Sequence, residues 1–220
     1  MTYKRLAAAC FVLSLTFFAH AENIEHQDKK ENYRFFTDTK SGNDWREFKG
    51  TDGLSYETIL KKLESDHKFK GWRIASEQEV KALISNTLEV PVAELEGLAL
   101  SGDERIIQLI RLLDGGDCNQ TICVAGLVSD PAPECSHSGA EEGEQCRTFM
   151  KIEARSVADQ AAWEKHYSDE SVAGCDRKII KNPGDPRPPC AITYGDVLPD
   201  MSIDRVVWLR NGVYLIRPSH

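Results

Sequence analysis

Beyond its first 21 residues, the sequence lacks any apolar run long enough to cross a bilayer. The start of the chain differs. Lys4 and Arg5 precede an apolar run over 6–18, and Ala19-His20-Ala21 has the small-x-small pattern of a cleavage site. Because that run is short, the pattern predicts a signal peptide over 1–21 rather than a membrane anchor. We therefore expect an exported protein, periplasmic or extracellular, that does not span a membrane.

The sequence also lacks an excess of positive charge. It holds 27 Lys and Arg against 35 Asp and Glu, a formal net charge of −8. Removal of the leader with Lys4 and Arg5 leaves 25 basic and 35 acidic residues, a formal charge of −10. Such a surface repels nucleic acid and anionic membranes, so nucleic-acid binding is not expected. Solubility is the simplest role for this charge.

Common catalytic motifs are missing. The sequence contains no Gly-x-Ser-x-Gly, His-Glu-x-x-His or P-loop pattern. The nearest approach to an acid–base cluster is Glu164, His166 and Asp169, which lie close together in a polar stretch. Such a cluster is more typical of a solvated surface than of an active site. We therefore predict that the protein is not an enzyme.

Cysteine is confined to the C-terminal half once Cys10 is removed with the leader. An even number of cysteines in an exported chain predicts three disulfides, although sequence alone does not choose among the pairings. Pairing of neighbours (118–123, 135–146 and 175–190) would give three small stapled loops. Zinc is the rival use, but no Cys-x-x-Cys pair is present and an oxidising compartment favours disulfides. The six cysteines are Cys118, Cys123, Cys135, Cys146, Cys175 and Cys190.

The first half of the mature chain reads as strands followed by helices. Residues 22–32 are polar and are predicted to be a flexible N-terminus. A strand over 33–37 and a returning strand from Trp45 flank a run of turn-forming residues. Ser55 is placed to cap a helix to about residue 64 whose buried stripe would be Ile59, Leu60 and Leu63.

Two capping boxes predict the next helices. Ser76 with Glu79 opens one of them, with Val80, Leu83 and Ile84 as its buried stripe, and Ser101 with Glu104 opens another that ends at Gly115-Gly116. Between them, Pro91 can start a short helical turn. Glu79 is therefore expected to cap a helix rather than to act as a catalyst.

The second half reads as strands and loops. Strands are predicted over 123–128 and 147–154, joined by an acidic loop, and the region 114–200 is rich in loops. At the end of the chain, Asn211-Gly212 between apolar runs predicts a two-residue hairpin turn within 206–217. Its core face would carry Val207, Leu209, Tyr214 and Ile216. Trp208, on the other face, is a candidate ligand contact, although burial by a neighbouring segment is the more common use of such a ring.

Several stretches occur in an order that resembles a known family. They are DTKSGNDW at 38–45, GLSY at 53–56, FKGWRIASEQEV at 69–80 and a closing LIRP. This order resembles secreted bacterial domains that often carry a PEP-CTERM sorting tail, and these in turn are similar to Lcl-type domains with a C-type-lectin-like fold. Two departures are Asn43-Asp44, where an apolar residue is expected, and the lack of a PEP-CTERM tail. The matching positions are Asp38, Thr39, Gly42, Trp45, Gly53, Leu54, Ser55, Tyr56, Phe69, Gly71, Trp72, Arg73, Glu79 and Val80.

The resemblance implies an α+β fold over a single domain, 33–220. Two to three helices would pack on an antiparallel sheet, with the N-terminal strand near the C-terminal hairpin and a disulfide-stapled second half. Trp72 would lie where a loop meets the core, and Arg73 would pair with a nearby acid. Both would then be structural residues.

The same resemblance implies a non-catalytic binding or adhesion domain for a glycan or another envelope component. The alternatives are a structural or partner-binding envelope protein that uses 114–200 and, less favoured, an enzyme of the formylglycine-generating type, whose chemistry needs reactive cysteines. No cofactor is expected. Calcium could bind at a cluster of oxygen ligands, and Glu141, Glu142 and Glu144 are the nearest such group, although an acidic run is usually a solvated loop. Oligomeric state is not predicted.

Overall fold

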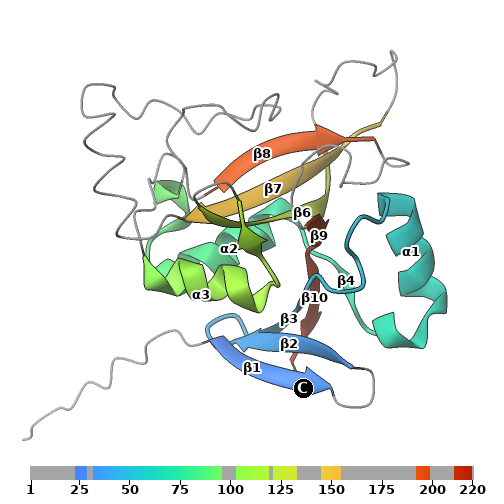
Figure 1. Cartoon of the computed structure of the whole chain (residues 1–220), viewed down its shortest axis with the longest axis horizontal. Helices are drawn as coiled ribbons and strands as arrows, with labels where there is room; N and C mark the ends of the chain where they lie inside the picture. The colour runs from blue at the N-terminus through green and yellow to red at the C-terminus, as the bar shows by residue number, and fades with distance from the viewer. Residues whose placement is uncertain are drawn as a thin grey trace, which may run out of the picture.

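The computed structural model describes residues 23–28, 32–95, 103–118, 121–132, 145–154, 192–198 and 211–219. In these segments the chain is a mixed α+β protein with three α-helices and two sheets whose strand pairs are almost all antiparallel (Figure 1). The α+β class is thus confirmed. Several predicted sites lie outside the described residues, namely Cys135, Glu141, Glu142, Glu144, Cys175, Cys190, Trp208 and the Glu164, His166 and Asp169 cluster.

The first sheet brings together the first and the last strand of the described segments. Its strand order is β1-β2-β3-β10-β4, and every pair in it is antiparallel. The C-terminal strand therefore lies next to the early strands, as the resemblance implied. The strands are β1 Asn23–Asp28, β2 Tyr33–Asp38, β3 Asn43–Arg46, β4 Arg73–Ile74 and β10 Leu215–Pro218.

The second sheet is built from the second half of the chain. Its order is β5-β6-β7-β8, and β9 pairs in parallel with β6. Since β9 and β10 are separated only by Tyr214, the last segment of the chain belongs to both sheets. The strands are β5 Gly116–Asp117, β6 Ile122–Pro131, β7 Arg147–Ala154, β8 Ile192–Val197 and β9 Asn211–Val213.

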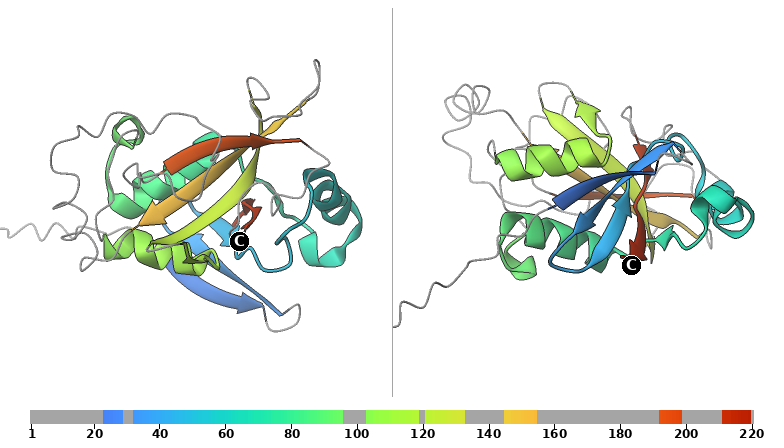
Figure 2. Two further views of the ribbon diagram at one scale, coloured as in Figure 1. Left: turned by 45° about the horizontal axis from the view of Figure 1, so that its top comes forward. Right: turned by 90° about the horizontal axis from the view of Figure 1, so that it is seen from below.

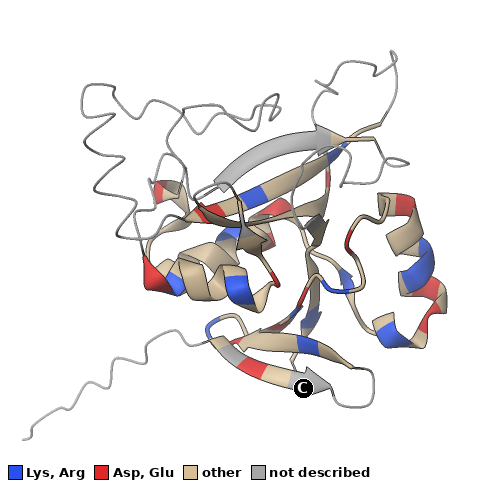
Figure 3. Ribbon diagram, viewed as in Figure 1, with Lys and Arg blue, Asp and Glu red and all other residues tan. Residues whose placement is uncertain are grey.

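Helices lie on two sides of this framework. Helices α2 and α3 lie together, and α1 lies well apart from them, as the views agree (Figures 1 and 2). Acidic and basic residues are interspersed along all three (Figure 3). The elements are α1 Tyr56–Ser65, α2 Glu77–Leu88 and α3 Glu104–Leu112, with 3-10 turns at His67–Phe69 and Val92–Glu94.

The last strand segment separates two hydrophobic cores. Tyr214 and Ile216 pack with α2 and α3 in one cluster, which we call the α2–α3 core. Val213 and Leu215 pack with α1 in the other, which we call the α1 core. All four side chains are at most 1% exposed, so this segment is buried on both faces. A strand in that position joins the two halves of the fold.

The predicted C-terminal hairpin is wrong. Asn211-Gly212 lies in β9, where Gly212 is the register partner of Gly126 on β6, and Gly212 does not have a positive φ. Glycine is needed there for space: a Cβ on Gly212 would lie 2.7 Å from Phe48 Cβ and Cγ. Close packing, and not turn geometry, explains the glycine.

Three other local predictions are corrected. Asn23–Asp28, expected to be flexible, forms an edge strand whose pairing with β2 supplies backbone hydrogen bonds that its polar composition does not reveal. Asp103, rather than Ser101, caps α3, because its side chain accepts a hydrogen bond from the Arg105 N–H. Leu60 is 40% exposed, whereas Ile59 is buried as predicted and Tyr56 is the second buried residue of α1.

Other predictions are confirmed. Ser55 caps α1, and Ser76 and Glu79 form the predicted capping box of α2. Cys118 and Cys123 form a disulfide, and Cys146 is also disulfide-bonded. No helix in the described part of the chain is long and apolar enough to cross a membrane.

Candidate functional site

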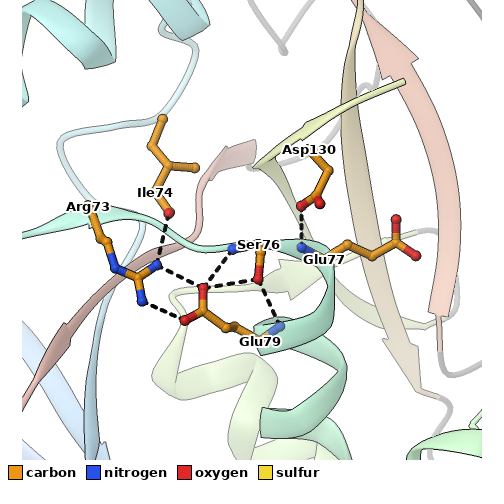
Figure 4. Close-up of polar contacts among 6 residues, drawn as sticks. All are labelled: Arg73, Ile74, Ser76, Glu77, Glu79 and Asp130. Atoms are coloured by element: carbon orange, nitrogen blue, oxygen red, sulfur yellow. Dashed lines mark hydrogen bonds and ion pairs between the residues drawn. The ribbon is translucent and has the colours of Figure 1, made fainter. Parts of the chain in front are cut away.

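Arg73 joins β4 to the start of α2 (Figure 4). Arg73 Nη1 and Nη2 donate to the two carboxylate oxygens of Glu79, at 2.8 and 2.5 Å. Glu79 also accepts from the Ser76 backbone N–H, at 2.9 Å, as the capping box requires. The Arg73 hydrogen bond lowers the pKa of Glu79 to about 2, against an opposing effect of burial. The predicted pairing of Arg73 with an acid is confirmed.

A second carboxylate completes this helix end. Asp130, on β6, accepts a hydrogen bond from the Glu77 N–H at 2.5 Å. The first turn of α2 is therefore held by both sheets, through Arg73 on one side and Asp130 on the other (Figure 4). Its polar groups are used within the fold, so we assign this cluster a structural role.

Replacing Glu79 by Gln should destabilise the fold by about 1 kcal/mol, because it removes the ion pair and weakens the cap. The depressed pKa means that this contribution is present above the unfolded pKa near 4.5 and is lost as pH falls toward about 2. Urea denaturation at pH 7 and pH 3 measures it, and the difference between wild type and Glu79→Gln should shrink at pH 3. Glu57→Gln, at an exposed position in the first turn of α1, is the control. A variant as stable as wild type at pH 7 would contradict this role.

Trp72 is an anchor of the α1 core. Its side chain is 5% exposed, and its ring packs edge-on against Tyr33 and Phe35, at centroid distances of 6.1 and 6.2 Å. Edge-to-face packing of this kind adds to the free energy gained by burial. The loop before β4 is thereby fixed to β2.

Arg46 places a buried cation in the same region. It is 3% exposed, and its guanidinium lies 3.9 Å from the Tyr33 ring centroid and 4.2 Å from that of Phe69. Nη1 donates to the Lys68 carbonyl at 2.7 Å, and burial lowers the arginine pKa. Among the described residues no carboxylate lies within ion-pair distance of it. Aromatic faces therefore contact this cation directly, and Glu47 and Asp66 attract it from beyond ion-pair distance.

A row of planar groups lies on the same face of the first sheet, closer to solvent. The His26 and Phe35 rings stack at 5.0 Å, and the Arg217 guanidinium lies 4.8 Å from Phe35 and 4.4 Å from Trp72. We call these four residues the planar row. Strand register and strand order explain the planar row. His26 on β1 is opposite Phe35 on β2, and β10, which carries Arg217, follows β2 and β3 in the sheet.

A chain of polar contacts runs beside the planar row. Arg217 Nε donates to Asp44 at 3.0 Å, and the Thr37 hydroxyl donates to the other Asp44 oxygen at 2.7 Å. His26 Nε2 lies 3.1 Å from the same hydroxyl. A hydroxyl has one proton, and here Asp44 takes it, so His26 Nε2 must be the donor to Thr37. The donor and the acceptor of each contact are thus fixed along this chain, from His26 on β1 to Arg217 on β10.

The side chains of the planar row and its polar neighbours are partly exposed to solvent and are held in place by their contacts. The Arg217 side chain is 20% exposed, His26 is exposed, and Phe35 and Thr37 are half-buried. Partly exposed aromatic and arginine side chains on a rigid sheet are typical of recognition surfaces. We therefore take the planar row, with Thr37 and Asp44, as the candidate functional site.

The residues singled out in the sequence form the framework around it. Asp38 is buried and accepts from Lys40 N and from Asn86 Nδ2, on α2. Trp45 and Tyr56 are buried in the α2–α3 and α1 cores. Gly42 and Gly71 have φ of +68° and +84°, so each supplies a left-handed turn.

Sequence reasoning missed Arg217, His26, Thr37 and Asp44. The Arg217–Asp44 contact joins residues 173 positions apart, and no local pattern encodes it. One signal was available: in the strand predicted over 33–37, Tyr33, Phe35 and Thr37 alternate onto one face. The residues that contact this face come from β1, β3 and β10, and they could be identified only once the strand order was known.

Metal ligands are not brought together in the described segments, which hold no group of three or more His, Cys, Asp or Glu side chains in position to share an ion. The proposed calcium ligands in the acidic loop lie outside those segments. Comparison with family models, curated proteins and solved structures found no match to this chain.

Proposed function

We propose that this chain is an exported, non-catalytic binding domain that uses the planar row to recognise a glycan or another envelope component. A C-type-lectin-like arrangement and membership of the Lcl-like group are part of this proposal. The observation that carries it is that Arg217, which is partly exposed, is held by contacts with the Phe35 and Trp72 rings and by its hydrogen bond to Asp44. An ordered cation beside aromatic rings gives directional hydrogen bonds and a flat apolar surface without further loss of side-chain entropy.

The surrounding contacts support a binding role for this face. Arg46 is fixed by Tyr33 and Phe69 beneath the row, and Thr37 and Asp44 orient the polar groups beside it. Preorganised polar groups around a partly exposed aromatic surface favour ligand binding because little reorganisation is needed.

A thermal-shift screen of mature 22–220 tests this function. The panel is calcium, zinc, peptidoglycan fragments and common saccharides, each with wild type and with Arg217→Ala. A ligand at about 100 times its dissociation constant should add about 2.7 kcal/mol of stability to wild type. We expect that gain to be lost in Arg217→Ala.

Arg111→Ala is the matched control, since it removes an equal charge from an exposed position on α3. It should keep the full gain. Two results would contradict the proposal: a ligand that stabilises Arg217→Ala as much as wild type, or no stabilisation by any member of the panel.

A further inference from the structure

We propose that the outer edge of β1 is a second interaction surface, which binds an extended polypeptide segment of a partner protein as an added strand. This surface goes beyond the proposed function and does not depend on the ligand of the planar row. Strand β1 ends the first sheet, and β2 is its only partner among the described strands (Figure 1). Alternate residues of β1 therefore direct their backbone N–H and C=O groups away from β2, where another strand can pair with them.

The β1 edge is long and regular. Its six residues, Asn23–Asp28, pair with β2 in one unbroken register, so no bulge turns this edge away from a partner. The segment contains neither lysine nor proline, the residues that most often protect an open edge. At other ends of the two sheets, β4 and β5 have only two residues each, so they offer few free backbone groups. The geometry of β1 therefore suits strand addition.

The ring stack on this sheet points to the same edge. The His26 ring on β1 and the Phe35 ring on β2 lie within 25° of parallel, with centroids 5.0 Å apart. Since neighbouring strands are about 4.8 Å apart, the stack follows the spacing of the sheet. Phe35 contacts one face of the His26 ring, which the Thr37 hydroxyl holds at 3.1 Å through Nε2, and His26 is exposed. A flat side chain on an added strand would stack on the face of His26 that is turned away from Phe35.

Charge selects the partner segment. Glu25 precedes His26 and therefore lies on the opposite face of β1, where its side chain is 51% exposed and pairs with Arg34 at 3.3 Å. A lysine or an arginine opposite Glu25 on the added strand would form a cross-strand pair of unlike charge. The β1 sequence contains no lysine or arginine, so a second copy of β1 does not supply this charge. We therefore expect a partner segment in which an aromatic and a basic side chain are adjacent.

Titration of ¹⁵N-labelled mature 22–220 with a short peptide tests strand addition. The probe is acetyl-Thr-Val-Lys-Tyr-Lys-Val-Thr-amide, in which lysines on both sides of the tyrosine suit either strand direction. We expect saturable amide shifts that are largest along β1 at peptide concentrations up to about 1 mM. Two further versions carry backbone N-methyl groups at alternate residues, one at the valines and the tyrosine and the other at the threonines and the lysines. Because only one set of N–H groups faces β1, one version should bind at least about ten-fold more weakly, and the other should bind as the parent does.

Replacing His26 by alanine tests the ring contact. His26→Ala should weaken binding of the peptide by about three- to ten-fold, because the tyrosine loses the ring on which it stacks. In this variant, replacing the peptide tyrosine by alanine should have little further effect. His67→Ala is the control, since His67 is a histidine on the turn His67–Phe69 whose side chain is 73% exposed, and it should leave binding unchanged.

Reversing the charge of Glu25 tests the second contact. Glu25→Lys should weaken binding of the lysine peptide by about ten-fold and strengthen binding of a version with glutamate in place of both lysines. Glu104→Lys is the matched control, because Glu104 is also exposed and pairs with an arginine, Arg111, at 3.7 Å. It should change neither affinity by more than about two-fold.

The outcomes separate this surface from the planar row. Equal affinity of the two N-methylated peptides, or shifts that avoid β1, would overturn strand addition. Arg217 lies on β10, which β2 and β3 separate from β1, so Arg217→Ala should keep peptide binding within about two-fold. A loss in Arg217→Ala as large as in His26→Ala would overturn a separate surface. Failure of the lysine peptide to bind would overturn this inference and leave the proposed function, which the saccharide panel tests, unaffected.

Discussion

Replacing Trp72 by alanine should lower the free energy of unfolding by about 3–5 kcal/mol, the largest loss that we predict for one residue. Trp72 is 5% exposed and contacts the rings of Tyr33 and Phe35 and the Arg217 guanidinium. Alanine removes all of these contacts and leaves a cavity between β2, β4 and α1. Chemical denaturation of mature 22–220 measures the change.

Two controls separate packing from polar effects at Trp72. The indole N–H is buried and has no hydrogen-bond partner among the described residues, so Trp72→Phe removes no polar contact seen there and should cost less than half as much as Trp72→Ala. Leu60→Ala changes an apolar residue of α1 that is 40% exposed and should be within about 0.5 kcal/mol of wild type. A Trp72→Ala protein of wild-type stability that has lost ligand binding would make Trp72 a ligand contact and contradict its structural role.

Replacing Gly212 by alanine should destabilise the protein by about 2–3 kcal/mol through steric overlap. Its Cβ would lie 2.7 Å from Phe48 Cβ and Cγ and from Thr51 Oγ1. Neither neighbour can move easily: Phe48 packs edge-on against Tyr214 at 4.9 Å, and Thr51 Oγ1 accepts from the Val213 N–H at 3.2 Å. Urea denaturation gives the loss directly.

A double-mutant cycle distinguishes this overlap from a turn effect. Phe48→Ala removes Cγ, one of the overlapping atoms, and the ring that holds Phe48 Cβ in place, so the double variant with Gly212→Ala should be more stable than the sum of the single losses predicts, by about 1 kcal/mol or more. Gly50→Ala is the comparison, since it has a φ of +89° and open space, and it should show only a backbone cost of about 1 kcal/mol. Additivity in the cycle would indicate a turn at Asn211-Gly212 and contradict β9.

Local features were predictable because they depend on residues a few positions apart. The Ser76–Glu79 capping box, the Ser55 cap and the alternation along β7 each follow from side chains that meet within one turn or one strand. Cys118 and Cys123 are five residues apart, and their pairing is one of those that the sequence left open. The same reasoning correctly gave Trp72 to the core.

The structure of Asn211-Gly212 could not be predicted in this way. The dipeptide has the composition of a hairpin turn, but tertiary packing decides its structure. Gly126 lies opposite Gly212 in the parallel β6–β9 pair, and a Cβ there would lie 2.6 Å from Phe48 Cζ. Two glycines thus make room for the same buried ring. Tertiary packing overrides local turn preference here.

The candidate site could not be predicted from the sequence for a related reason. The planar row takes its residues from β1, β2, β10 and the loop before β4, and only the strand order β1-β2-β3-β10-β4 places them together. His26 also came from a segment that was predicted to be flexible. The acidic loop was chosen instead because its charges are contiguous in sequence.

Amide chemical-shift mapping on ¹⁵N-labelled mature 22–220 tests the central claim most directly. The ligand is the panel member that stabilises wild type most. The account predicts that the largest shifts cluster at His26, Phe35, Thr37 and Arg217, with changes at the Arg217 Nε–H and the Trp72 indole N–H. Shifts confined to the acidic loop around Glu141, Glu142 and Glu144, with the planar row unchanged, would contradict it.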